Sequence, residues 1–160
     1  MYKFSLLCLA LTSCGLLGNS EKCDPGDKKV YNSAIISFEL QDVLTSQNLL
    51  DLRGVYDPDT VKIYSANRER VFRGPVRPDG LIDFAPLRQE LDQLPYATDL
   101  TRNYYLYLNR ADQDTFFLAF RLRKNDCGFA EFERYTLKYN GKEVAAGEGL
   151  YLPSLILHKK

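Results

Sequence analysis

The first residues with the right types and spacing for chemistry are Leu11-Thr12-Ser13-Cys14, which close a short apolar run near the N-terminus. This pattern is typical of a bacterial lipobox, in which small residues precede a cysteine whose thiol receives a diacylglyceryl group. The freed amine of Cys14 is then open to a further acyl chain such as palmitate. One chain binds a bilayer marginally, whereas two or more anchor stably, at about 0.8 kcal/mol for each buried methylene group. The alternative is ordinary secretion, with Cys14 an incidental thiol.

The segment before the lipobox fits a signal peptide. Lys3 supplies a positive charge and residues 4–11 are mostly apolar. As a helix this apolar run would be about 12 Å long, which is too short for a hydrocarbon core of roughly 30 Å. We therefore expect residues 1–13 to be removed, and Cys8 with them.

Two cysteines remain once Cys14 is assigned to lipid. They are Cys23 and Cys127, and an even pair fits an oxidising compartment. A disulfide between them would close a loop of about 100 residues, worth up to roughly 4–5 kcal/mol in the chain-entropy model. Two free thiols are the alternative. No metal site is expected, because two lone cysteines and one histidine, without C-x-x-C spacing, cannot build a tetrahedral site.

Few side chains are available for catalysis. The single histidine, His158, lies beside Lys159 and Lys160 in what we expect to be a frayed tail, and no G-x-S-x-G, H-E-x-x-H or P-loop motif occurs. The remaining option is a pair of carboxylates spaced for hydrolysis. Pairs two residues apart occur at Asp57/Asp59, Asp112/Asp114 and Glu131/Glu133. The first two pairs are expected in turns, where they are also candidates for calcium, and charged residues on a solvent-facing strand are the default. We expect no enzyme and no cofactor.

Aromatic residues offer a binding surface instead. The candidate ligand-binding residues are Tyr105, Tyr107, Tyr135 and Tyr139, on two expected strands. Together they would form a stripe on which sugars or a partner protein could stack. The alternative is that these rings fill the second side of a sheet or cover its edge, since strands favour aromatic residues. The complete absence of Trp weakens a glycan-binding interpretation.

Composition and charge limit the partners. The chain has 21 basic and 21 acidic residues, which argues against a surface that neutralises nucleic-acid phosphates. No second apolar stretch approaches the roughly 18 residues of a spanning helix. Residues 14–28 are rich in Gly, Ser, Asp and Pro and are expected to be a lipidated flexible tether. Gly15, rather than Asp, at the second mature position favours the outer membrane.

Residues 29–160 show the alternating pattern of a β-domain. Ile36, Phe38 and Leu40 share one face of a strand, and long alternating runs recur in the second half of the chain. We expect strands over residues 34–40, 61–64, 71–73, 81–84, 103–109, 115–123, 129–139 and 150–157, the last an edge strand.

Turn signals separate these strands. Residues 110–114 are expected to turn the chain, and Asn140-Gly141 is the strongest hairpin signal because both residues tolerate positive φ. Residues 85–96 favour one short helix, with an extended connection as the alternative. Regular short strands with little helix predict an all-β fold, a two-layer antiparallel β-sandwich of about 7–8 strands.

Two stretches carry a family resemblance. They are FELQDVLTSQNLLDLRGVYDPDTVKIYS (38–65) and YYLYLNRADQDTFFLAFRLRKNDCGFAEFERYTLKYNGK (104–142). They resemble small uncharacterised lipoproteins of Bacteroidota cell envelopes, and this resemblance implies an immunoglobulin-like or prealbumin-like sandwich without known activity. Cys127 followed by Gly128 departs from the paired cysteines of such proteins, which weighs against the disulfide. We expect a non-enzymatic envelope lipoprotein that binds the bilayer through Cys14 and an envelope partner through its domain. The alternative is a glycan- or peptide-binding module.

Overall fold

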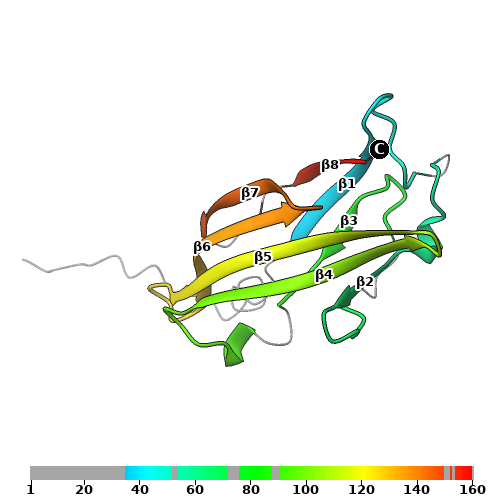
Figure 1. Ribbon diagram of the computed structural model, residues 1–160. Helices are drawn as coiled ribbons and strands as arrows, with labels where there is room; N and C mark the ends of the chain where they lie inside the picture. Colours follow the sequence, from blue (N-terminus) through cyan, green and yellow to red (C-terminus); the bar gives the residue numbers. More distant parts are fainter. Residues whose placement is uncertain are drawn as a thin grey trace, which may run out of the picture.

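The computed structural model describes residues 35–51, 54–71, 76–87, 91–149, 152 and 154–159. Within these ranges the chain forms eight strands and two short 3₁₀ turns (Figure 1). The strands are β1 (Ile36–Asp42), β2 (Lys62–Ser65), β3 (Ile82–Phe84), β4 (Asp99–Asn109), β5 (Asp112–Lys124), β6 (Ala130–Tyr139), β7 (Lys142–Gly149) and β8 (Leu155–Lys159).

The strands make two sheets that face each other across one core. One sheet has three strands in the order β3-β1-β8, and the other has five in the order β2-β4-β5-β6-β7. The expected all-β, two-layer sandwich is confirmed. All neighbouring strands are antiparallel except β1 and β8, which are parallel, so the fully antiparallel prediction is wrong for that pair. Consecutive strands β7 and β8 lie in different sheets, so no hairpin sets the direction of β8.

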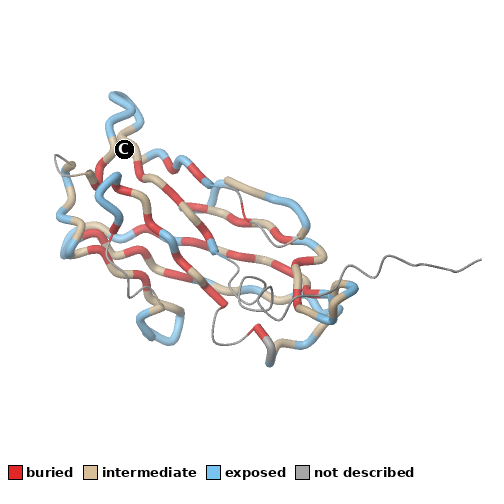
Figure 2. The backbone as a smooth tube through the Cα atoms, turned by 180° about the vertical axis from the view of Figure 1, so that it is seen from behind, coloured by how far each residue is buried: buried red, intermediate tan, exposed pale blue. Residues whose placement is uncertain are grey.

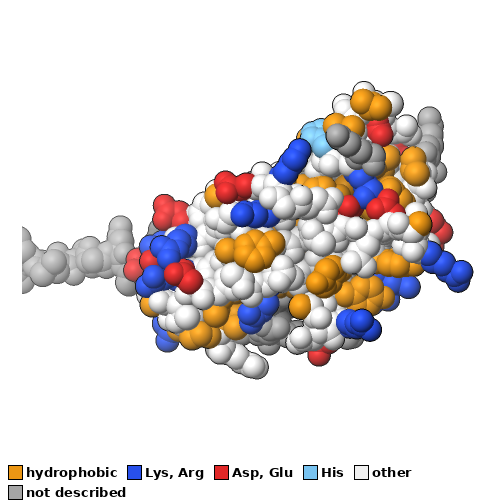
Figure 3. All heavy atoms as spheres, viewed as in Figure 1, with side chains coloured by type: hydrophobic (Ala, Val, Ile, Leu, Met, Phe, Trp, Pro, Cys, Tyr) orange, Lys and Arg blue, Asp and Glu red, His pale blue; other side chains and the backbone are white. Residues whose placement is uncertain are grey.

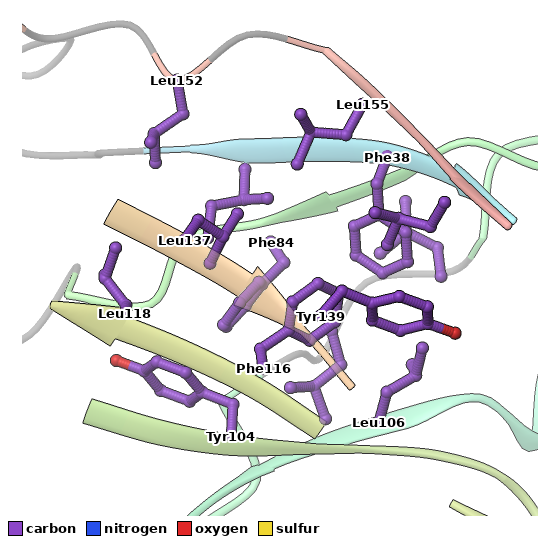
Figure 4. Close-up of a cluster of buried hydrophobic side chains, with 14 of the residues drawn as sticks. Phe38, Phe84, Tyr104, Leu106, Phe116, Leu118, Leu137, Tyr139, Leu152 and Leu155 are labelled. Carbon is purple, nitrogen blue, oxygen red and sulfur yellow. The ribbon is translucent and has the colours of Figure 1, made fainter. Parts of the chain in front are cut away.

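Alternation along the strands fills the core, as the sequence predicts. Ile36, Phe38 and Leu40 are fully buried on β1, and buried and less buried residues alternate along β4 and β5 (Figure 2). Aromatic rings from opposite sheets meet in the centre (Figure 4). The ring centroids of Phe38 and Phe116 are 5.1 Å apart, and those of Phe84 and Tyr104 are 5.0 Å apart. Burial of these side chains is the main force that holds the two sheets together.

The hairpin between β6 and β7 forms where it was predicted. Asn140 and Gly141 have φ values of 46° and 79°, and Tyr139 pairs directly with Lys142, as a two-residue type I′ turn requires. The expected strands left out residues 142–149, although the hairpin predicted at Asn140-Gly141 requires a partner strand there. The structure forms β7 there, because the turn returns the chain alongside β6.

The short helix predicted within residues 85–96 can be compared only in part, because residues 88–90 lie outside the described ranges. Within residues 85–96, the described part contains only η2 (Leu91–Gln93), and a second turn, η1 (Pro58–Thr60), precedes β2. Of the strand expected over 71–73, residues 72 and 73 lie outside the described ranges, and Val71 is outside any strand. No helix in the described part of the chain is long and apolar enough to cross a bilayer.

Candidate functional site

The deepest charged side chain among the described residues is Asp114, which is 4% exposed. It lies where the start of β5 meets the end of β8. The side chains that connect to it through hydrogen bonds are here called the Lys159 cluster: Tyr56, Asp112, Asp114, Tyr139, Asn140 and Lys159.

Both carboxylates of the Lys159 cluster are fully paired. Lys159 Nζ donates to both oxygens of Asp114, at 2.8 and 2.7 Å, and lies 2.7 Å from Asp112 Oδ1. Tyr139 Oη and Asn140 Nδ2 each donate a hydrogen bond to Asp114, at a distance of 2.7 Å. Tyr56 Oη donates a hydrogen bond to Asp112. One lysine cannot balance two carboxylates, so these neutral donors supply the remaining stabilisation.

Electrostatics keep Lys159 and Asp112 ionised. Burial alone would lower the pKa of Lys159, but hydrogen bonds to Asp112 and Asp114 outweigh burial and raise that pKa. Burial opposes ionisation of Asp112, but hydrogen bonds from Lys159 and Tyr56 outweigh it, so its pKa is lowered. A protonated amine has no lone pair with which to attack a substrate or accept a proton. The arrangement therefore fits a structural ion pair between the two sheets.

Two expectations from the sequence are wrong here. Residues 110–114 do not all turn the chain, because Asp112 already begins β5 and the turn is confined to Arg110 and Ala111. The C-terminal tail is not frayed up to Lys159, because β8 pairs with β1 through Lys159 while His158 stays exposed. The two errors have different causes. Residues 112–114 extend β5 by pairing with the adjacent strand β4, whereas β8 is ordered by contacts with β1 and Asp114, which are far away in the sequence.

Among the other paired carboxylates, Glu131, Glu133 and Asp57 also have partners. Glu131 and Glu133 pair with Arg123 and Arg121, at 2.6 and 3.0 Å. Asp57 caps η1, because its side chain accepts a hydrogen bond from the backbone N–H of Asp59 at 3.0 Å. In the described ranges, no three His, Cys, Asp or Glu side chains gather in a way that could hold a metal ion.

The four candidate tyrosines do not share one face. Tyr135 and Tyr139 are 5% and 4% exposed and belong to the hydrophobic core, so their prediction as ligand-binding residues is wrong. The i, i+2 period explains why, since both lie on the same side of β6 as the fully buried Leu137. Tyr105 and Tyr107 are half-buried on β4, on the side opposite the core.

The structure adds neighbours to the two outward-facing tyrosines. Tyr64 of β2 pairs directly with Tyr105, and half-buried Phe117 of β5 lies on the same side of the sheet. Lys62 Nζ lies 5.8 Å from the ring centroid of Tyr107, and Lys138 Nζ lies 5.9 Å from that of Phe117. We call these residues the outer aromatic face: Lys62, Tyr64, Tyr105, Tyr107, Phe117 and Lys138.

Sequence reasoning missed Tyr64, Phe117 and both lysines as members of this face. The alternation of β5 already places Phe117 away from the core, so a signal for it existed. The pairing of Tyr64 with Tyr105 depends on the β2–β4 register, which no local pattern of the sequence sets. Figure 3 shows hydrophobic side chains at the surface over β4 and β5, with Lys or Arg beside them.

Of the three cysteines with a predicted role, only Cys127 lies among the described residues. Cys127 lies half-buried in the turn between β5 and β6, where its backbone N–H donates to Asn125 Oδ1 at 3.0 Å. Cys14 and Cys23 lie outside the described residues, as do the segments predicted to be a signal peptide and a tether. Lipidation of Cys14 and a Cys23–Cys127 disulfide therefore stay predictions.

No model of a protein family, no curated protein and no solved structure matches this chain.

Proposed function

We propose that this chain is a non-catalytic interaction module of the bacterial cell envelope, anchored in a bilayer through acylated Cys14. The observation that carries the proposal is the lipobox Leu11-Thr12-Ser13-Cys14 behind a short apolar run that starts after Lys3. The first described strand, β1, begins 22 residues after Cys14 (36 − 14 = 22), a length of chain that is enough for a tether between lipid and domain. Gly15 favours the outer membrane as the place of residence.

A binding role suits the body of the domain. The Lys159 cluster pairs its two carboxylates with an amine and three neutral donors, and Glu131 and Glu133 each pair with an arginine. These carboxylates are thereby engaged in contacts that hold strands together. The outer aromatic face instead offers Tyr105 and Tyr107 toward solvent.

A second candidate function, binding of a glycan or peptide, is favoured by that face. Tyr64, Tyr105, Tyr107 and Phe117 gather on three neighbouring strands, whereas strands usually direct single aromatic rings outward. The two proposals are compatible, because a lipid-anchored module needs a surface with which to bind its target.

The anchor is tested with the full chain, produced with its own leader in a bacterium that processes lipoproteins. We expect incorporation of an alkyne-labelled palmitate, partition into the detergent phase, and an intact mass that starts at residue 14 with acyl chains added. Cys14→Ser should lose all three. Cys8→Ser is the matched control: it changes the other cysteine of the leader, lies in the removed segment, and should leave the mature product unchanged. A wild-type product without acyl mass would contradict the proposal.

The proposed outer-membrane location is tested separately. In an enterobacterial host, wild-type protein should sediment with the outer membrane on a density gradient. Gly15→Asp should shift it to the inner membrane without loss of acyl mass. Equal sedimentation of both proteins would refute the sorting inference and leave the anchor itself intact.

A further inference from the structure

We propose that the outer aromatic face binds an extended acidic polysaccharide, with sugar rings against the aromatic side chains and a carboxylate group near Lys62. This inference deepens the ligand-binding role proposed above and rests on it. It comes from the register of three strands, the polar residues between the rings, and the charges beside them.

The rings follow a continuous path over three strands. Tyr64 and Tyr105 are direct cross-strand partners, and Tyr107 follows two residues along β4. Phe117 pairs with Asn103, which puts it one step beyond Tyr105 in the other direction. The four residues from Asn103, the partner of Phe117, to Tyr107 span about 13 Å along β4, because each residue advances about 3.3 Å. This length suits a few consecutive units of a polymer and exceeds what a single small molecule needs.

The residues between the rings suit a ligand rich in hydroxyl groups. Asn103, Gln113 and Thr115 are exposed on the same face, beside Phe117, Tyr107 and Tyr105. Amide and hydroxyl side chains donate and accept hydrogen bonds, as sugar hydroxyls do. Aromatic rings between such groups offer flat apolar surface to the C–H side of a sugar ring.

The position of the face within the sheet disfavours an extended peptide. A peptide that adds a strand needs the free backbone groups of a sheet edge. Strands β4 and β5 are both interior, with hydrogen-bonded neighbours on either side. Recognition on this face therefore depends on side chains alone, which is the situation of a stacked glycan.

Charge favours an acidic ligand over a neutral one. Lys62 and Lys138 lie over rings of this face, whereas Arg121 and Arg134 are ion-paired with Glu133 and Asp99. In register, Lys138 faces Glu143 of β7, which offsets part of its charge. Lys62 is therefore the stronger attraction for a carboxylate.

The test uses full-length lipidated protein in mild detergent, run in native gels that contain polysaccharide. The probes are polygalacturonate, alginate and fully methyl-esterified polygalacturonate, which keeps the sugar chain but removes its charge. We expect retardation by at least one of the two acidic polymers and at least tenfold weaker affinity of that polymer for Tyr105→Ala. Lys62→Gln should weaken binding and flatten its salt dependence.

Lys124→Gln is the matched control for Lys62→Gln. Lys124 Nζ also lies close to an aromatic ring, 5.2 Å from the ring centroid of Tyr96, but this pair lies outside the outer aromatic face. Replacement of Lys124 should leave retardation unchanged. The proposal is overturned if neither acidic polymer retards the protein, if the methyl ester binds equally well, or if Tyr105→Ala alters self-association of the protein instead. Palmitate labelling measures lipidation of Cys14 independently of polysaccharide binding. A failure of the polysaccharide proposal is therefore distinguishable from a failure of the lipid-anchor proposal.

Discussion

Lys159 of β8 extends across the sandwich to Asp114 of β5, and its Nζ lies 2.8 and 2.7 Å from the two carboxylate oxygens. The pair joins the two sheets at the C-terminal end of β8. Strand β8 follows no hairpin and pairs in parallel with β1. A slip of one residue would turn Lys159 outward and leave the carboxylate of Asp114 buried without its cation. We infer that this ion pair helps to set the register of β8, together with the burial of Leu155 and Leu157 on the same face.

Replacement of the lysine should therefore be costly. Lys159→Met keeps much of the buried hydrocarbon but leaves Asp112 and Asp114 close together without a cation. Loss of one partner of a buried ion pair typically costs about 3–5 kcal/mol. Urea unfolding at pH 7 followed by far-UV circular dichroism measures this loss. Lys142→Met, at an exposed position of β7, should change stability by no more than about 0.5 kcal/mol. Equal effects of the two variants would contradict the structural role of Lys159.

The same contacts make stability depend on pH. Because the pKa of Asp112 is lowered in the folded state, its stabilising contribution is present above its unfolded pKa of about 3.9 and is lost as the pH falls through the folded value. We expect the stability difference between wild type and Asp112→Asn to be constant from about pH 5 to pH 8 and to shrink below about pH 4. Urea titrations at several pH values measure it. A difference that stays constant down to pH 2.5 would show that Asp112 is not stabilised as an anion.

At alkaline pH the dependence is the opposite, because the contribution of Lys159 to stability is lost as the pH rises. The pKa of Lys159 is raised in the folded state, so its contribution is complete below its unfolded pKa of about 10.4 and is lost as the pH rises through the folded value. The stability difference between wild type and Lys159→Met should therefore persist through pH 10 and decline only above it. A decline that begins near pH 8 would contradict the ion pair.

Local rules account for most of the fold. Alternation placed Phe38, Leu106 and Phe116 in the core, and the Asn140-Gly141 pair located the hairpin between β6 and β7. These features depend on neighbours within a few residues. The same alternation should have excluded Tyr135 from the surface, since it shares a face of β6 with core residues.

What the sequence does not reveal depends on contacts between distant residues. The parallel pairing of β8 with β1 joins segments more than 100 residues apart (155 − 38 = 117 for Leu155 and Phe38). Asp114 looked like a turn residue, but it pairs with Leu106 of β4, and its cation Lys159 lies in the other sheet. The outer aromatic face needed the β2–β4 register before Tyr64 could be placed beside Tyr105.

The type I′ turn offers a local test. Gly141 has a φ of 79°, and a Cβ at this position would have nothing within 4 Å, so Gly141→Ala would be penalised only through its backbone. An L-residue in the left-handed region costs about 1–2 kcal/mol, and we expect that loss in urea unfolding. Gly128→Ala is a matched comparison with a φ of 75° and equally open surroundings, and it should lose a similar amount. Lys142→Ala, in extended backbone, should be nearly neutral. An unchanged stability of Gly141→Ala would mean that the hairpin turns differently in solution.

The predicted disulfide between Cys23 and Cys127 would add a covalent link that stabilises the folded domain. Cys127 occupies an ordered turn in which Asn125 Oδ1 accepts hydrogen bonds from the backbone N–H groups of residues 127 and 129, at 3.0 and 2.9 Å. A bridge from there to Cys23 would fix the segment before β1 to the β5–β6 end of the sandwich. Protein isolated from the envelope should then carry a Cys23–Cys127 peptide pair in a non-reducing digest. Reduction should cost up to about 4–5 kcal/mol because the closed loop is long. Cys127→Ala should show the same loss without reductant and no further loss with it, whereas free thiols on both residues in native material would refute the bridge.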